Sequence, residues 1–227
     1  MKYPFFASFI VFGFLFSFSM KKRTKNEKKY VDNFWEQERL ADSTRRKSLN
    51  SLDYIAVPLN ELPMDMLEDL PEIEECLCKI RELSEKKIVN FAGRSNTELK
   101  LTYGAPNINL LTEYDKNFED LIVTLQTWAL TLLQNWGPGA QACPEEERKQ
   151  AAKKVLAYAV SVGSDISATY ESLIKLYLEY GEQDKLPGLR EKAEKIRSLS
   201  KGRILAMIED ASETDRVIAY PASSSQT

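Results

Sequence analysis

The chain has 227 residues, of which 43% are hydrophobic and 29% are charged, a composition typical of a folded protein rather than a disordered one. Ten Lys/Arg and five Asp/Glu fall within residues 20–50, yet the net charge is −3, so the rest of the chain is acidic and no nucleic acid partner is expected. The chain has no histidine, which excludes the commonest general base, the commonest zinc ligand and every Ser-His or Cys-His nucleophile.

An uncharged run rich in phenylalanine occupies residues 3–20. Its 18 residues match the roughly 17–25 that a transmembrane helix needs. Six Lys/Arg follow within residues 21–29, and a basic flank of this kind marks the cytoplasmic side of a membrane. We therefore predict a single-pass anchor over residues 1–20 that contacts the membrane through residues 3–20 and carries a cytoplasmic C-terminal domain.

Two alternatives to this anchor are open. Ser17 and Ser19 form a weak small-x-small cleavage pattern, so the run could be a signal peptide that releases a secreted or surface-displayed domain. The run could also be an interfacial helix.

Residues 21–50 are predicted to form a basic juxtamembrane or stalk helix. The large apolar residues between positions 27 and 47 are too few for a core helix; they are Tyr30, Phe34, Trp35 and Leu40. The basic run could contact anionic lipid headgroups, although a plain topology signal would also explain it.

The next part of the chain alternates between extended and helical patterns. Pro58 and Pro63 predict an extended segment near residues 53–60. A helix is predicted from Pro71, which has acidic residues in its first turn, to Gly93. Alternating Leu99, Leu101 and Tyr103 predict a second short extended segment near 97–103, with a loop as the alternative.

The remainder is predicted to be helical because apolar residues recur every three or four positions. A final helix begins near Pro187 and continues, with an irregularity at Gly202, to residue 210, and residues 211–227 are predicted to be a disordered tail. The breaks at Gly137, Gly163 and Gly181 divide the earlier part into three helices, which are predicted at 109–136, 144–162 and 165–180.

The hairpin at residues 166–199 has the residue spacing of a helical repeat, carried by Tyr170, Leu173, Ile174, Tyr177, Gly181 and Ala193. In this respect it resembles a tetratricopeptide repeat, and Ala159 stands one 34-residue repeat before Ala193. The break at 137–144 falls outside the repeat register, so an unrelated antiparallel bundle is the alternative. The predicted fold is thus all-α, with an N-terminal transmembrane helix and a domain of antiparallel, repeat-like hairpins over residues 51–210.

The resemblance implies a binding face, because first helices of such repeats line a concave surface that binds peptides or helices. On helix 165–180 the residues left outside the packing set are Glu171, Lys175, Leu178 and Glu179. These four are the predicted partner-binding residues, and an ordinary solvated face is the alternative.

We predict from these features a membrane-anchored helical interaction module that binds a protein or peptide and has no catalytic residues, cofactor or metal. The competing enzyme hypothesis needs carboxylates to hold a divalent cation. The candidates are Glu72, Glu74 and Glu75, with Glu145, Glu146 and Glu147. Neighbouring carboxylates on one helix do not converge, and the positive end of the helix dipole explains both clusters. The three cysteines, Cys76, Cys78 and Cys143, are interpreted as small apolar or partly exposed residues.

Overall fold

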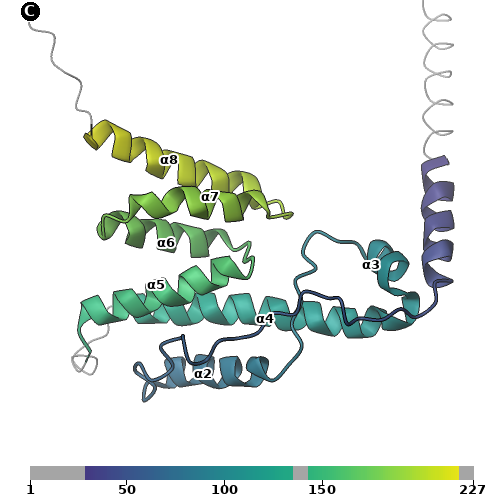
Figure 1. Ribbon diagram of the computed structural model, residues 1–227, viewed down its shortest axis with the longest axis horizontal. Coiled ribbons are helices and arrows are strands. Elements are labelled where there is room, and N and C mark those ends of the chain that lie inside the picture. Colours follow the sequence, from purple (N-terminus) through teal and green to yellow (C-terminus); the bar gives the residue numbers. More distant parts are fainter. Residues whose placement is uncertain (1–28, 135–142, 220–227) are drawn as a thin grey trace, which may run out of the picture. The chain divides into compact units, whose positions relative to one another are not determined.

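The computed structural model describes residues 29–134 and 143–219, with side chains to residue 213 (Figure 1). Within these ranges every regular element is a helix, which confirms the all-α class. The predicted anchor at residues 1–20 lies outside the described residues. None of the helices that are described is long and apolar enough to cross a membrane.

The described residues form two compact units. Among these residues, the first unit contains 29–49 together with Ser95–Ile108, and the second contains Asn50–Arg94 together with 109–134 and 143–219. The predicted domain over residues 51–210 is therefore interrupted, since a segment in its middle belongs to the first unit.

The first unit holds a helix over residues 29–42, helix α3 (Asn96–Tyr103) and the short 3-10 helix η1 (Ala105–Asn107). The extended segment predicted near 97–103 is wrong, because α3 occupies it. Ser95 accepts a hydrogen bond from the Glu98 backbone N–H, and the Glu98 side chain accepts one from the Ser95 N–H. This capping box outweighs a three-residue alternation of apolar side chains.

Polar contacts join the helix over residues 29–42 to α3. Lys100 Nζ lies 3.2 Å from Glu38 and 2.7 Å from Asp42, and the Thr97 hydroxyl donates a hydrogen bond to Glu38. The Thr97 bond and the Lys100 bond lower the pKa of Glu38. Gly104 ends α3 with φ 94°, and a Cβ there would lie 2.2 Å from the Arg45 carbonyl oxygen, so only glycine fits this approach.

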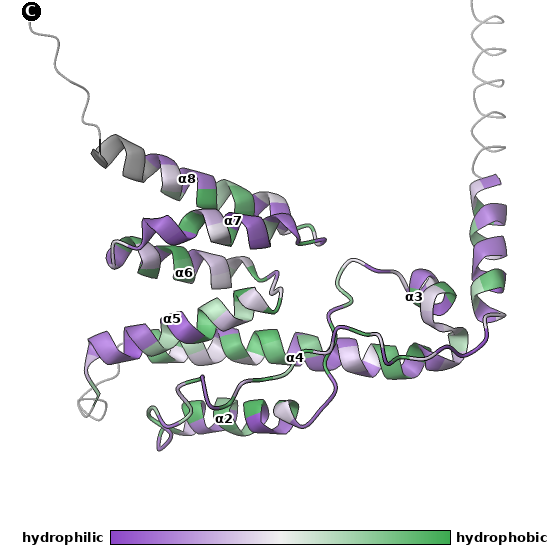
Figure 2. Cartoon of the chain, viewed as in Figure 1, coloured by the Kyte–Doolittle hydropathy of each residue, from purple (hydrophilic) through white to green (hydrophobic). Residues whose placement is uncertain are grey.

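The second unit consists of helices around one hydrophobic core, to which all six α-helices contribute side chains. Figure 2 shows hydrophobic residues interspersed with hydrophilic ones along these helices, as the amphipathic patterns predict. The largest fully buried side chains include Trp128 and Tyr170. The elements are α2 (Pro71–Ser84), α4 (Ile108–Leu133), α5 (Glu145–Ser161), α6 (Ser167–Glu179), η3 (Gln183–Lys185), α7 (Leu186–Glu194) and α8 (Lys201–Ala219).

Helix α5 lies beside α6, and α7 lies beside α8 (Figure 1). Helix α6 packs on both α5 and α8, and α7 packs on α8. Ala159 and Ala193, the residues at the 34-residue spacing, are both completely buried, as small side chains at close helix contacts commonly are. The resemblance to a tetratricopeptide repeat stays a prediction.

Helix α2 ends at Ser84, well before the predicted end at Gly93. The chain after it makes long-range backbone hydrogen bonds in place of helical ones. Val89 N–H donates to the Tyr114 carbonyl at 3.3 Å, and Ile55 N–H donates to the Ile88 carbonyl at 2.9 Å. The segment around Ile55 is non-helical over residues 53–58, as predicted from its prolines.

The helix predicted from Pro187 to residue 210 is two helices. Helix α7 ends at Glu194 and α8 begins at Lys201, so the break falls before Gly202 rather than at it. Tertiary contacts hold the break: the Ser200 hydroxyl donates to the Asp165 carbonyl at 2.7 Å. Helix α8 continues to Ala219, so the start predicted for the tail at residue 211 falls inside a helix. Residues 220–227 lie outside the described ranges.

Candidate functional site

The four residues predicted to bind a partner lie on α6. The three charged ones form ion pairs within the domain. Lys175 and Glu171 form an ion pair at 2.8 Å, which lowers the pKa of Glu171. Glu179 accepts a hydrogen bond from Lys149 of α5 at 2.6 Å, and Leu178 packs half-buried against the core. Lys175 is the most solvent-exposed member, with 71% of its side chain accessible.

A larger charge cluster lies where α5 meets the end of α6. Lys149 Nζ is 2.7 Å from Glu145 as well as close to Glu179, and these hydrogen bonds raise the pKa of Lys149. Lys153 pairs with Glu182 at 2.9 Å and sits 4.3 Å from the centroid of the Tyr180 ring. Each cation here has a carboxylate partner, so the cluster stabilises the helix contact and leaves little free charge for a ligand.

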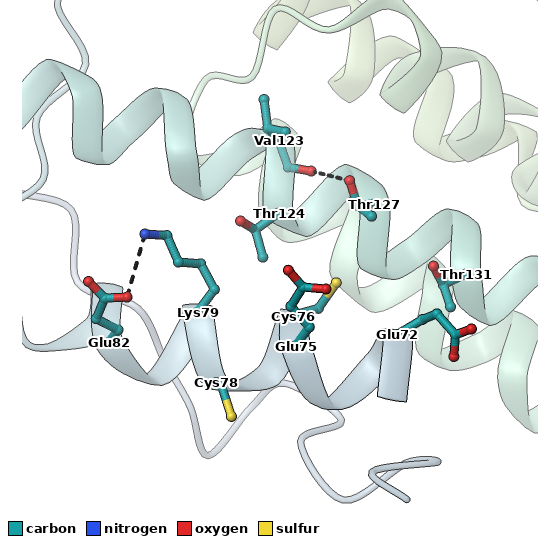
Figure 3. A pocket seen from close by; sticks show the side chains of 10 residues that line it. All are labelled: Glu72, Glu75, Cys76, Cys78, Lys79, Glu82, Val123, Thr124, Thr127 and Thr131. Atoms are coloured by element: carbon teal, nitrogen blue, oxygen red, sulfur yellow. Dashed lines mark hydrogen bonds and ion pairs between the residues drawn. The ribbon is translucent and has the colours of Figure 1, made fainter. Parts of the chain in front are cut away.

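A groove of about 730 Å³ lies between α2 and α4 (Figure 3). Both helices belong to the second unit. The groove has two chemically different walls, one from each helix. It is lined by Glu72, Glu75, Cys76, Cys78, Lys79, Glu82, Val123, Thr124, Thr127 and Thr131.

The α4 wall presents methyl groups. The hydroxyl of Thr124 donates to the Asp120 carbonyl at 2.7 Å, and that of Thr127 donates to the Val123 carbonyl at 2.9 Å. Because these hydroxyls bond to their own helix, their hydrogen-bonding capacity is used locally. Val123 also lines the groove, and it is 55% exposed.

The α2 wall is acidic. Lys79 Nζ is 3.5 Å from both Glu82 and Asp120, so its charge is neutralised by two carboxylates. In Figure 3 the side chain of Glu75 points from α2 toward α4, and that of Glu72 extends past the start of α2. Neither glutamate forms an ion pair with any residue in the described part of the chain, so this wall carries uncompensated negative charge.

Local sequence explains why α2 carries this wall. Pro71 starts the helix, and Glu72 and Glu74 occupy its first turn, where the N-terminal dipole favours carboxylates. The apolar face of α2 is buried in the core through Ile73, Leu77, Ile80 and Leu83. Beside this face runs a polar line at spacings of three and four residues: Glu72, Glu75, Lys79 and Glu82. That line is readable in the sequence, but its threonine-bearing partner wall is not.

The acidic residues and cysteines do not assemble into a metal centre in the described ranges, where no group of three or more Cys, Asp or Glu could hold an ion. Cys76 is buried, Cys78 is exposed and Cys143 is intermediate, and all three are free thiols. Burial, together with the nearby Glu75 carboxylate, raises the pKa of the Cys76 thiol. This thiol therefore resists ionisation, unlike a reactive cysteine.

Comparison of the chain with protein-family models, with curated proteins and with solved structures finds no match. The likeness of residues 166–199 to a tetratricopeptide repeat therefore rests on the residues themselves. The function is proposed below from the α2–α4 groove and from the distribution of charge.

Proposed function

We propose that this protein is a non-catalytic interaction module, anchored in the membrane by residues 3–20, whose cytoplasmic helical domain binds a segment of another protein. The α2–α4 groove carries the proposal. Its volume of about 730 Å³ lies within the range of roughly 300–1,000 Å³ that is typical of ligand sites.

The chemistry of the two walls defines the partner segment. The uncompensated carboxylates of Glu72 and Glu75 favour Lys or Arg, whereas Val123 and the threonines of α4 favour aliphatic side chains. An amphipathic helix with one basic edge and one aliphatic edge satisfies both walls, and docking such a helix into a groove is a common mode of recognition. The acidic balance of the chain outside residues 20–50 would also speed the approach of a basic segment.

The α6 face is the second candidate surface. It has the exposed Lys175 and Glu171, but these already neutralise each other, and Glu179 is bound by Lys149. A partner there would gain little from charge, because exposed and already paired ions contribute little to binding. We therefore favour the groove.

Site-specific photo-crosslinking in cells tests the choice. A photoreactive amino acid replaces Val123 in one variant and Lys175 in the other, and both sites are exposed on helices of the same unit. We expect the probe at position 123 to crosslink one protein through a segment with basic and aliphatic residues. Combining the probe with Glu72→Lys and Glu75→Lys should abolish that product.

The matched control for the charge reversal is Glu171→Lys, which changes an exposed helical carboxylate on α6 without touching the groove. This variant should keep the crosslink from position 123. A crosslink that appears only from position 175 would assign binding to the α6 face. If neither position crosslinks a protein, the interaction function is wrong.

Protease accessibility and intact mass distinguish the proposed cytoplasmic domain from the alternative of a secreted or surface-displayed domain. Cytoplasmic placement predicts that proteases degrade the domain in lysates but not in intact cells, and that the intact mass includes residues 1–20. Loss of that segment together with protease sensitivity on intact cells would favour release. A thermal stabilisation by divalent cations would revive the acidic-site enzyme, which we do not favour.

A further inference from the structure

The helix over residues 29–42 has an apolar surface that no described residue covers. We call it the aromatic stripe, and it consists of Tyr30, Val31, Phe34 and Trp35. The exposed fractions of these residues are 77%, 48%, 48% and 59%. The rings of Phe34 and Trp35 contact each other edge to face, with centroids 5.4 Å apart, so the aromatic partner of each is the other.

The stripe occupies one face of the first two turns. Residues spaced i, i+1, i+4 and i+5 share a face of an α-helix, whereas Asp32 and Glu36 fall on the opposite side. Seven residues further on, Glu38 and Ala41 continue the same face, where Lys100 of α3 binds Glu38 and where Ala41 is fully buried. Helix α3 therefore occupies the last two turns of this face and leaves the first two turns bare.

We propose that the aromatic stripe lies in the headgroup region of an anionic membrane, so that the first two turns of this helix rest in the lipid interface while α3 holds the last two. The inference rests on the proposed membrane anchor. Charge complementarity selects the occupant: six Lys/Arg lie within residues 21–29, directly before the stripe, and basic residues beside a membrane are attracted to anionic lipid.

The chemistry of the stripe also fits an interface. Tyrosine and tryptophan combine an apolar ring with a polar tip, and both are enriched where hydrocarbon meets water. A second copy of the chain is a poorer occupant. Four side chains on two turns provide much less than the roughly 800 Å² per partner that stable protein interfaces bury.

Tryptophan quenching tests the proposal on the full chain, incorporated as one copy per nanodisc. The discs contain lipids with brominated acyl chains, made either of phosphatidylcholine alone or of phosphatidylcholine with phosphatidylserine. We expect brominated lipid to quench a component of the fluorescence that disappears in Trp35→Phe, and to quench it more strongly when phosphatidylserine is present. Trp128 is completely buried in the second unit and should not contribute to that difference.

Two variants make the test specific. Phe34→Glu places a charge in the stripe and should reduce the quenching of Trp35, whereas Leu40→Glu changes a residue that is 57% exposed on another face and should leave it intact. If the chain stays in the disc but Trp35 is not quenched, the interfacial stripe is wrong and the anchor stands. If the chain does not stay in the disc, the anchor fails and the stripe proposal falls with it.

Discussion

Trp35 and Trp128 both lie on α-helices, yet one is 59% exposed and the other is completely buried. Trp128 belongs to α4, and its core includes side chains from α2, α5 and α6. Trp35 belongs to a helix whose partner, α3, has only eight residues. The number and length of the neighbouring elements therefore decide whether protein covers a tryptophan on a helix.

Replacing Trp128 by alanine should have the largest effect on stability. Removing a fully buried indole should lower the free energy of unfolding by about 3–5 kcal/mol, because the lost packing is only partly recovered by relaxation. Trp35→Ala is the control and should change it by less than about 0.5 kcal/mol. Urea denaturation of the full chain in detergent measures both, and equal losses would contradict the comparison.

A substitution of Arg148 tests whether a buried charged side chain contributes to the stability of the fold. Arg148 is 7% exposed, and its Nη1 donates to the carbonyls of Leu132 at 3.2 Å and Gln134 at 2.6 Å, at the end of α4. Arg148→Ala should cost about 1.5–3 kcal/mol, since hydrogen bonds from charged donors are strong and these carbonyls would lose their partner. Arg190→Ala, which breaks only an exposed pair with Glu194, should cost less than about 1 kcal/mol in the same denaturation experiment.

A buried hydrogen bond between α6 and α4 should have a smaller effect. Thr169 and Gln126 are 0% and 7% exposed, and the threonine hydroxyl donates to the glutamine side-chain oxygen. Thr169→Val should cost about 1–2 kcal/mol because it leaves the Gln126 carbonyl without this donor. Adding Gln126→Leu should recover part of the loss. A double-mutant cycle with no coupling energy would show that the bond does not form.

Tyr170→Phe should have the smallest effect at neutral pH. The Tyr170 hydroxyl is buried without a hydrogen-bond partner in the described part of the chain, so its removal should stabilise the fold by less than about 1 kcal/mol. Burial, with a further contribution from Asp165, raises the pKa of Tyr170 to about 12.

The raised pKa of Tyr170 also predicts a pH dependence with a definite sign. The neutral phenol is favoured in the folded state, so its contribution is complete below the ordinary tyrosine pKa near 10 and is lost as the pH rises through about 12. The phenylalanine variant lacks this loss, and its stability advantage should grow over that interval. Denaturation measured at several alkaline pH values checks the trend, and an advantage that stays constant would contradict it.

Several helices could be predicted almost to the residue because local signals set their ends. Pro144 and Gly163 bracket α5, and Gly181, with φ 66°, follows α6. Helix α3 was predicted wrongly because an apolar alternation was weighted above the capping box of Ser95. The early end of α2 and the break between α7 and α8 depend on hydrogen bonds to distant residues, which no local pattern contains.

One wall of the candidate groove could likewise be predicted from the sequence, and the other could not. The acidic line on α2, which includes Glu72 and Glu75, can be read from helical spacing. Its opposite wall cannot, because the threonines of α4 look like ordinary helix surface until α2 lies beside them.

The sequence by itself determined the helical class, the positions of most helices, the basic segment at residues 21–29 and the acidic balance of the rest. These depend on residue type and on spacing along one chain. Only the tertiary structure decided which faces meet, that Arg148 caps α4 from α5, that a groove opens between α2 and α4, and that the aromatic stripe stays bare. Each of these depends on distances between residues far apart in the chain, and helical periodicity holds no information about them.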